Sequence, residues 1–105
     1  MPYGVMGGHF QPMGQTLFLT NHFEFGLDLQ EAIDCPRLFP SPAKGVVEVE
    51  HGISGSIIDR LSRLGHQVVQ VEKPHGGGQA IFIDRKAGNL VGASDPRKDG
   101  CALGF

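Results

Sequence analysis

Two adjacent glycines, Gly7 and Gly8, are the first residues of the chain whose type and spacing suggest chemistry. They follow the apolar Val5 and precede a run with helical spacing, so we expect them where a short strand turns into a helix. Backbone amides at the start of a helix bind anions or a developing oxyanion. Two glycines also let a ligand approach the backbone closely. An ordinary tight turn is the alternative, and the spacing alone favours it.

The remaining candidate residues give weaker signals. Gly76, Gly77 and Gly78 suggest a phosphate loop, but no Lys-Ser/Thr follows and the next element is a strand, so a flexible turn before Gln79 is the favoured interpretation. Cys35 has no base nearby in the sequence and is predicted to be a small buried residue. No metal or other cofactor is expected, because no Cys-x-x-Cys occurs and the histidines lack metal-site spacing. The histidines are His9, His22, His51, His66 and His75.

The run Ser94-Asp95-Pro96-Arg97 follows the last predicted strand. Asp95 can cap a turn and Arg97 can pair with a carboxylate, so the run is predicted to pin the end of the chain against the core. A direct contact with a substrate is the alternative.

Helices and strands of an α/β fold are predicted around these residues. A strand at Val5 precedes a helix over about 10–25, which Gly26 ends. Asp28 and Glu31 form a capping-box pair that opens a second helix through about Asp34. The later elements are a loop over Leu38–Gly45, strands over Val46–Glu50 and Gln67–Glu72, a helix over about Ser54–Leu64, a loop over Lys73–Gly78 and a hairpin of Gln79–Asp84 with Asn89–Ser94.

The length and composition of the chain limit the classes of protein to which it can belong. The chain has 105 residues, which predicts a single domain over residues 1–105. It is 40% hydrophobic and 19% charged, which argues against disorder. A net charge of -2 gives no reason to expect nucleic acid as a partner. No apolar run is long enough to span a membrane, the first residues do not form a signal peptide, and the compartment stays open.

Three segments resemble one family over nearly all of the chain. They are GVMGGHFQPMGQ (Gly4–Gln15), FGLDLQEAIDCPR (Phe25–Arg37) and GGGQAIFIDRKAGNLVGASDPRKDG (Gly76–Gly100). Together they are similar to the C-terminal portion of the small subunit of γ-glutamyltranspeptidases. The resemblance implies the C-terminal part of an αββα sandwich of the N-terminal-nucleophile type, a mixed sheet with about three helices.

The same resemblance implies a chemistry. In that family an N-terminal threonine, activated by its own amine, attacks the γ-glutamyl amide of glutathione and related compounds, and water or an amino acid or peptide then takes the glutamyl group. Gly7 and Gly8 match the positions whose amides form the oxyanion hole, which reverses the balance in favour of a functional turn. His9 departs from the family pattern, and we assign it no catalytic role.

The nucleophile is the part of this chemistry that the 105 residues lack. Thr16 and Thr20 are the only threonines, and both lie within a predicted helix. The chain alone is therefore expected to be inactive. Its expected partners are the remainder of the same enzyme (an upstream small-subunit segment and a large subunit) or a second copy, with a small γ-glutamyl compound as substrate. A non-catalytic scaffold or assembly domain, and an anion-binding module built on Gly7 and Gly8, are the alternatives.

Overall fold

A computed structural model describes residues 1–105 and divides them into two compact units. The first unit consists of Met1–Cys35 and Gly76–Phe105, and the second consists of Pro36–His75. Six strands and three α-helices confirm the predicted α/β class. Whether the two units act as one domain stays a prediction. None of the helices has the length and apolar character needed to cross a membrane.

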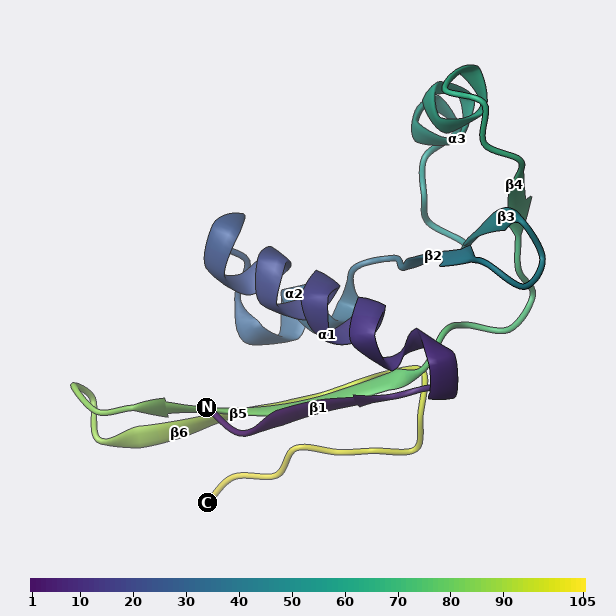
Figure 1. Ribbon diagram of the computed structural model, residues 1–105. Coiled ribbons are helices and arrows are strands. Elements are labelled where there is room, and N and C mark those ends of the chain that lie inside the picture. Colours follow the sequence, from purple (N-terminus) through teal and green to yellow (C-terminus); the bar gives the residue numbers. More distant parts are fainter. The chain divides into compact units, whose positions relative to one another are not determined.

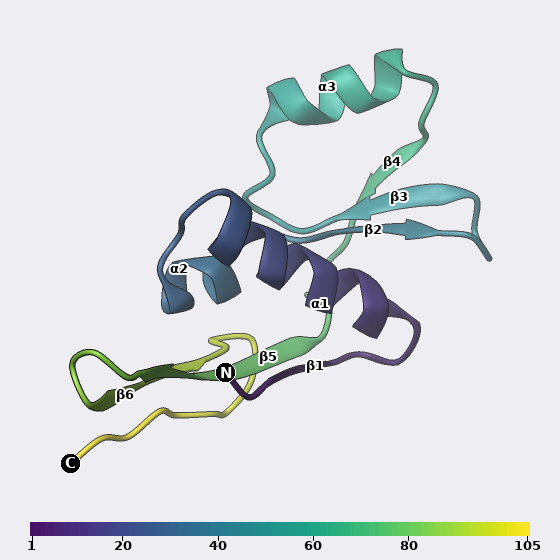
Figure 2. The ribbon, with the colours of Figure 1, turned by 60° about the vertical axis from the view of Figure 1, so that its left-hand side comes forward.

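The first unit contains an antiparallel sheet with the strand order β1-β5-β6 (Figures 1 and 2). Its strands are β1 (Tyr3–Met6), β5 (Gly77–Asp84) and β6 (Asn89–Ser94). The predicted hairpin is confirmed, and Gly88 closes it with φ 72° and an amide that donates to Asp84 O at 2.9 Å. Gly77 and Gly78 lie in β5, opposite Met6 and Val5. The loop predicted through Gly78 therefore ends earlier, because β1 offers these glycines a strand to pair with.

The first unit also contains a helical run and a second short helix. The run comprises the 3₁₀ turn η1 (Gly8–Phe10), α1 (Gln11–Leu19) and η2, a π-helix over Thr20–Glu24. Gly26 ends the run with φ 71°, as predicted. The helix α2 (Leu29–Asp34) opens with the predicted capping box, in which Asp28 and Glu31 exchange side-chain and backbone hydrogen bonds.

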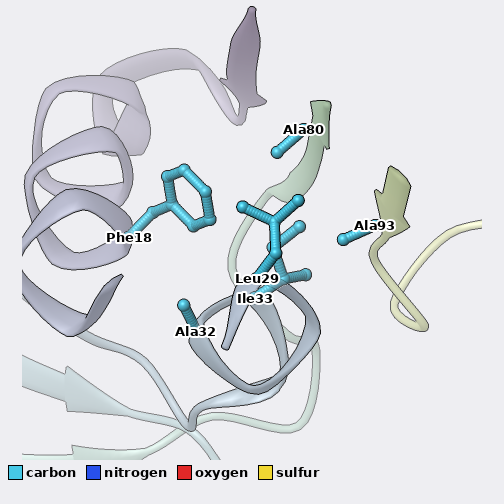
Figure 3. Close-up of a cluster of buried hydrophobic side chains, with 6 residues drawn as sticks. All are labelled: Phe18, Leu29, Ala32, Ile33, Ala80 and Ala93. Carbon is cyan, nitrogen blue, oxygen red and sulfur yellow. The ribbon is translucent and has the colours of Figure 1, made fainter. Parts of the chain in front are cut away.

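The core of the first unit lies between the helices and one face of the sheet. Figure 3 shows Phe18 of α1 directed at residues of α2, with Ala80 and Ala93 of the sheet on the other side. Ala80 and Ala93 are paired across β5 and β6, and their small side chains let α2 approach the sheet closely. The full cluster is Phe18, Leu29, Ala32, Ile33, Ala80 and Ala93.

The other face of this sheet carries the C-terminal tail (Figures 1 and 2). The tail crosses the sheet at glycines: Gly92 lies against Ala102, and Gly77 lies against the Lys98 side chain. It forms no strand, and Cys101–Phe105 have no regular secondary structure. Apolar side chains stay exposed on this face, namely Ile81 (43%), Ile83 (41%) and Leu90 (68%).

The second unit has a three-stranded mixed sheet and one helix. β2 (Leu38–Ser41) pairs antiparallel with β3 (Val46–Val49), which pairs parallel with β4 (Val68–Gln70). The helix α3 (Gly55–Arg63) connects β3 to β4. The predicted loop over Leu38–Gly45 is wrong in its first half, because Pro40 lies in β2. Since β2 is an edge strand, the amide that proline lacks is not needed for the sheet.

The second unit holds its own two ends together. The Glu50 carboxylate accepts hydrogen bonds from the amides of Arg37 (2.9 Å) and His75 (2.7 Å). The Arg37 guanidinium donates to His75 O at 2.8 Å. The chain therefore enters and leaves this unit at neighbouring points.

Candidate functional site

Gly7 and Gly8 lie at the turn between β1 and the helical run, as predicted. Gly7 has φ 142° and Gly8 has φ 57°, so both occupy backbone conformations that residues with side chains rarely adopt. Phe10 N donates to Gly7 O at 3.1 Å, and the Gln11 amide donates to Gly8 O. These two bonds close the turn and lead directly into α1.

The amides at this turn are open to a ligand. Gly7, Gly8 and His9 are exposed, and no hydrogen bond joins their amides to an acceptor of the chain. A methyl group at the Cβ position of Gly8 would meet no atom within 4 Å. The space above Gly8 is therefore unfilled by the first unit, at the positive end of the helical run. Such an arrangement can stabilise negative charge on an oxygen.

Gly76 lies beneath this turn. A Cβ atom on Gly7 would lie 3.0 Å from Gly76 Cα, so the two backbones touch at a point where no side chain fits. Gly76 itself has φ 61°. Gly76 therefore packs against the back of the Gly7 turn.

The Asp95–Arg97 pair fixes the start of β5. Asp95 is fully buried, and its Oδ2 accepts a hydrogen bond from the Gly78 amide at 2.7 Å. Its Oδ1 faces Arg97 Nη1 at 3.1 Å. Arg97 also donates to the carbonyls of Ile33 and Cys35, each at 3.0 Å, and so caps the C-terminal end of α2. These contacts support the predicted structural role of this run.

The remaining candidates lie away from the turn or have local roles. His22 Nδ1 is 2.9 Å from Leu27 O, and its ring packs edge-on against Phe82. Cys35 is half-buried. Thr16 Oγ1 donates to Pro12 O at 2.8 Å within the helix, and Thr20 begins η2. Across the whole chain no three His, Cys, Asp or Glu side chains gather in a way that would hold a metal ion.

A model of the γ-glutamyltranspeptidase family matches residues 1–105. The chain belongs to this family. It is 36% identical to the oxamate amidohydrolase proenzyme of Klebsiella pneumoniae over 100% of its own length and 35% identical to a glutathione hydrolase-like proenzyme of Bacillus subtilis over 98%. It spans 21% of the length of each of these relatives.

Solved structures of the family have the same fold. A cephalosporin acylase from Bacillus halodurans superimposes with a TM-score of 0.88 and 40% identity, covering 95% of this chain and 19% of that chain. A γ-glutamyltranspeptidase from Pseudomonas nitroreducens gives 0.86 and 25%, covering 98% of this chain and 54% of that chain. The predicted partial N-terminal-nucleophile fold is therefore confirmed.

Two parts of the site were not predicted from the sequence. The contact between Gly76 and the Gly7 turn joins distant parts of the chain, and only the unusual glycine content around both positions hinted at it. The burial of Phe10 beneath the turn was not predicted either, because the sequence indicated only a helix that begins at about residue 10. The buried positions Phe10, Gly14 and Phe18 recur every four residues, with a glycine in the middle of the stripe.

Proposed function

We propose that this chain supplies the oxyanion-binding turn of a γ-glutamyltranspeptidase-like enzyme. The observation that supports the proposal is the exposed Gly7–Gly8 turn with free amides at the start of a helical run. When a nucleophile adds to an amide carbonyl, the carbonyl oxygen takes on negative charge. The amides of Gly7 and Gly8 would donate hydrogen bonds to that oxygen and lower the barrier to the attack.

The reaction proposed for the complete enzyme has two stages. A threonine outside these 105 residues attacks the γ-glutamyl amide, and the amine leaves with a proton, so that the glutamyl group is joined to the threonine oxygen. Water or an acceptor amino acid or peptide then attacks this ester and frees the threonine. Each attack passes through an oxyanion, so the same turn would serve twice.

The relatives of this chain indicate which donor substrates to test. Glutathione hydrolases are among the relatives, which favours the γ-glutamyl amide of glutathione and related compounds. The relatives also include an oxamate amidohydrolase and two acylases. The donor panel for a first assay is therefore a γ-glutamyl anilide, glutathione and oxamate.

The chain is proposed to work as part of a larger protein. Its 105 residues correspond to about a fifth of the length of the relatives named above, where they match 21%. The exposed apolar residues on the outer face of the sheet, including Ile81 and Ile83, would be covered by the rest of the enzyme. In this chain alone neither threonine is placed as a nucleophile, because both lie within the helical run.

The test compares two glycine substitutions in the full-length enzyme, meaning this chain together with the part that carries the nucleophile. Gly8→Ala and Gly88→Ala place a methyl group at φ 57° and φ 72° respectively, and neither methyl group would meet an atom within 4 Å. Their backbone strain is therefore similar. Gly8→Ala keeps its amide, but its methyl group would enter the open space in which the oxyanion is proposed to bind. Loss of one oxyanion donor lowers kcat by about 100- to 1000-fold, so Gly8→Ala should approach that loss by keeping the oxygen away from the amide, while Gly88→Ala keeps the parent rate.

A different result would favour the scaffold interpretation. If the full-length protein hydrolyses none of the donors, the proposed enzyme activity fails. If it is active but Gly8→Ala changes kcat by less than about threefold, the turn does not bind the oxyanion. The Gly88→Ala control reports how much of any loss comes from backbone strain alone.

A further inference from the structure

The Phe10 ring lies beneath the Gly7–Gly8 turn, among three glycines. Phe10 is 3% exposed. Its ring atom Cδ1 lies 3.3 Å from the Cβ position of Gly7 and 3.0 Å from that of Gly76, and Cε1 lies 2.5 Å from that of Gly14. The ring therefore contacts backbone where any side chain would displace it. Such a contact is tighter than one between two flexible side chains.

Gly76 packs against both the Phe10 ring and the backbone of Met6. A Cβ atom on Gly76 would collide with the carbonyl oxygen of Met6, the residue that precedes the turn. Because that oxygen belongs to the backbone, the collision could be relieved only by moving Met6 and Gly7. Gly76 therefore fixes how far the turn can approach β5.

Gly76 and Phe10 are themselves held by hydrogen-bonded backbone on either side of the turn. Gly77, next to Gly76, pairs with Met6 in the sheet, and the Gly78 amide donates to the buried Asp95 carboxylate at 2.7 Å. The Phe10 amide closes the first turn of the helical run by donating a hydrogen bond to Gly7 O at 3.1 Å. The turn is thus supported by β5 on one side and by the first helical turn on the other.

We infer that Phe10 and Gly76 are positioning residues, which hold the amides of Gly7 and Gly8 in the direction needed to bind an oxyanion. This inference rests on the proposed function of that turn. Oxyanion donors lower a barrier only when they are already oriented before the reaction, and a site displaced by about half an ångström loses much of this benefit. Neither Phe10 nor Gly76 needs to touch the substrate to have this effect.

Gly76→Ala in the full-length enzyme is the first test, with Gly88→Ala as its matched control. Both positions have positive φ (61° and 72°), so the substitutions share the backbone strain. Only the methyl group at Gly76 meets Met6 and Phe10. We expect Gly76→Ala to lower kcat at least tenfold with KM within threefold of the parent, and Gly88→Ala to keep both values near the parent.

Phe10→Leu is the second test and decides the question if Gly76→Ala does not fold. Its matched control is Phe18→Leu, since Phe18 lies two turns further along the same helical run and is equally buried (4%), but packs in the core cluster. Both substitutions remove a buried ring and should lower the melting temperature. Only Phe10→Leu should also lower kcat of the folded enzyme.

The distinguishing readout is inhibition by a boronic acid analogue of the γ-glutamyl group. Its boron accepts the electron pair of the nucleophile and becomes tetrahedral, which places an oxygen where the oxyanion forms. If Phe10 and Gly76 orient the amides, the inhibition constant should rise by the same factor as kcat/KM falls. A purely structural role would lower the melting temperature and leave this inhibition constant unchanged.

Gly8→Ala, measured in parallel, separates this inference from the proposed function. If Gly8→Ala lowers kcat and weakens boronate binding while Gly76→Ala and Phe10→Leu match their controls, the positioning role is wrong and the oxyanion turn stands. If Gly8→Ala also leaves both quantities unchanged, the proposed function fails and the inference fails with it. If all three variants lose kcat and boronate affinity while Gly88→Ala and Phe18→Leu keep both, the proposed function and the positioning role are both supported.

Discussion

Asp95 shows how a single buried side chain can hold several elements of the first unit. It has no exposed surface, and it contacts the Gly78 amide of β5 and the Arg97 guanidinium that caps α2. Because Arg97 is also largely buried, with 11% of its side chain exposed, solvent cannot replace the carboxylate. The Asp95 carboxylate therefore stabilises the sheet and α2 at the same time.

Asp95→Ala should consequently be among the most destabilising substitutions in the chain. Removing one partner of a buried ion pair costs about 3–5 kcal/mol, because the other charge stays buried without it. Urea denaturation followed by circular dichroism measures this loss. Asp84→Ala is the control, since its carboxylate accepts hydrogen bonds from Lys86 and Ala87 only within the hairpin turn. Equal losses for the two variants would contradict the role of Asp95.

The sequence identified individual residues where the chemistry is local. Gly7 and Gly8 could be placed at a strand-to-helix turn because glycine pairs tolerate its backbone angles, and the Ser94–Arg97 run could be given a structural role from its turn residues. The contact of Phe10 with Gly76 could not be predicted in this way. It depends on the register of β1 and β5, which no local pattern specifies.

At the scale of single elements, α2 is the shortest of the three α-helices and relies most on its cap. The Glu31 amide donates to Asp28 Oδ1 at 2.8 Å, and the Asp28 amide donates to Glu31 Oε2 at 2.9 Å. A helix of six residues makes few hydrogen bonds of its own, so these two contribute a large share of its stability.

Asp28→Ala should therefore destabilise the first unit by about 1 kcal/mol, within a range of about 0.5–2 kcal/mol. The free energy of unfolding measured in urea tests this value. Asp34→Ala is the matched control at the other end of the same helix, where a negative charge is unfavourable to the helix dipole. It removes only the side-chain contact with Gln30 at 2.9 Å, and a change larger than that of Asp28→Ala would contradict the cap assignment.

Elements with a strong local signal were predicted and the others were not. The capping box, the hairpin and the Gly26 helix end all follow from residue type at fixed positions. β2 was missed because proline is typical of loops. Pro40 is compatible with a strand only because β2 lies at a sheet edge, which the sequence does not indicate. The π-helix over Thr20–Glu24 was missed because nothing in its residues distinguishes it from α-helix.

At the scale of the whole molecule, the purified 105-residue chain should have no γ-glutamyl transfer activity. Oxyanion donors act only after a nucleophile has attacked, and both threonines lie in the helical run. Incubation with a chromogenic γ-glutamyl anilide measures this directly. Turnover above the buffer blank that survives further purification would show that a nucleophile within these residues has been overlooked.

The isolated chain should also associate through the outer face of the first sheet. Ile81 and Ile83 are exposed there, whereas Phe18 on the helix side of the sheet is buried in the core. Light scattering should detect a dimer or a larger species, and replacement of Ile81 and Ile83 by serine should reduce it. Val69→Ser is the control, since Val69 is equally exposed (41%) on β4 of the second unit. Association that persists in the double variant would exclude this face.

The way Glu50 and Arg37 join the two ends of the second unit has a consequence for how such chains change over evolutionary time. Because the backbone enters at Arg37 and leaves at His75 within one hydrogen-bonded group, the residues between them form an interchangeable cassette. Insertions, deletions or a complete exchange between Arg37 and His75 need not separate the two chain segments on either side, because the two ends of this stretch stay hydrogen-bonded to each other. Relatives could therefore differ most within this stretch while keeping the glycine turn and its support intact.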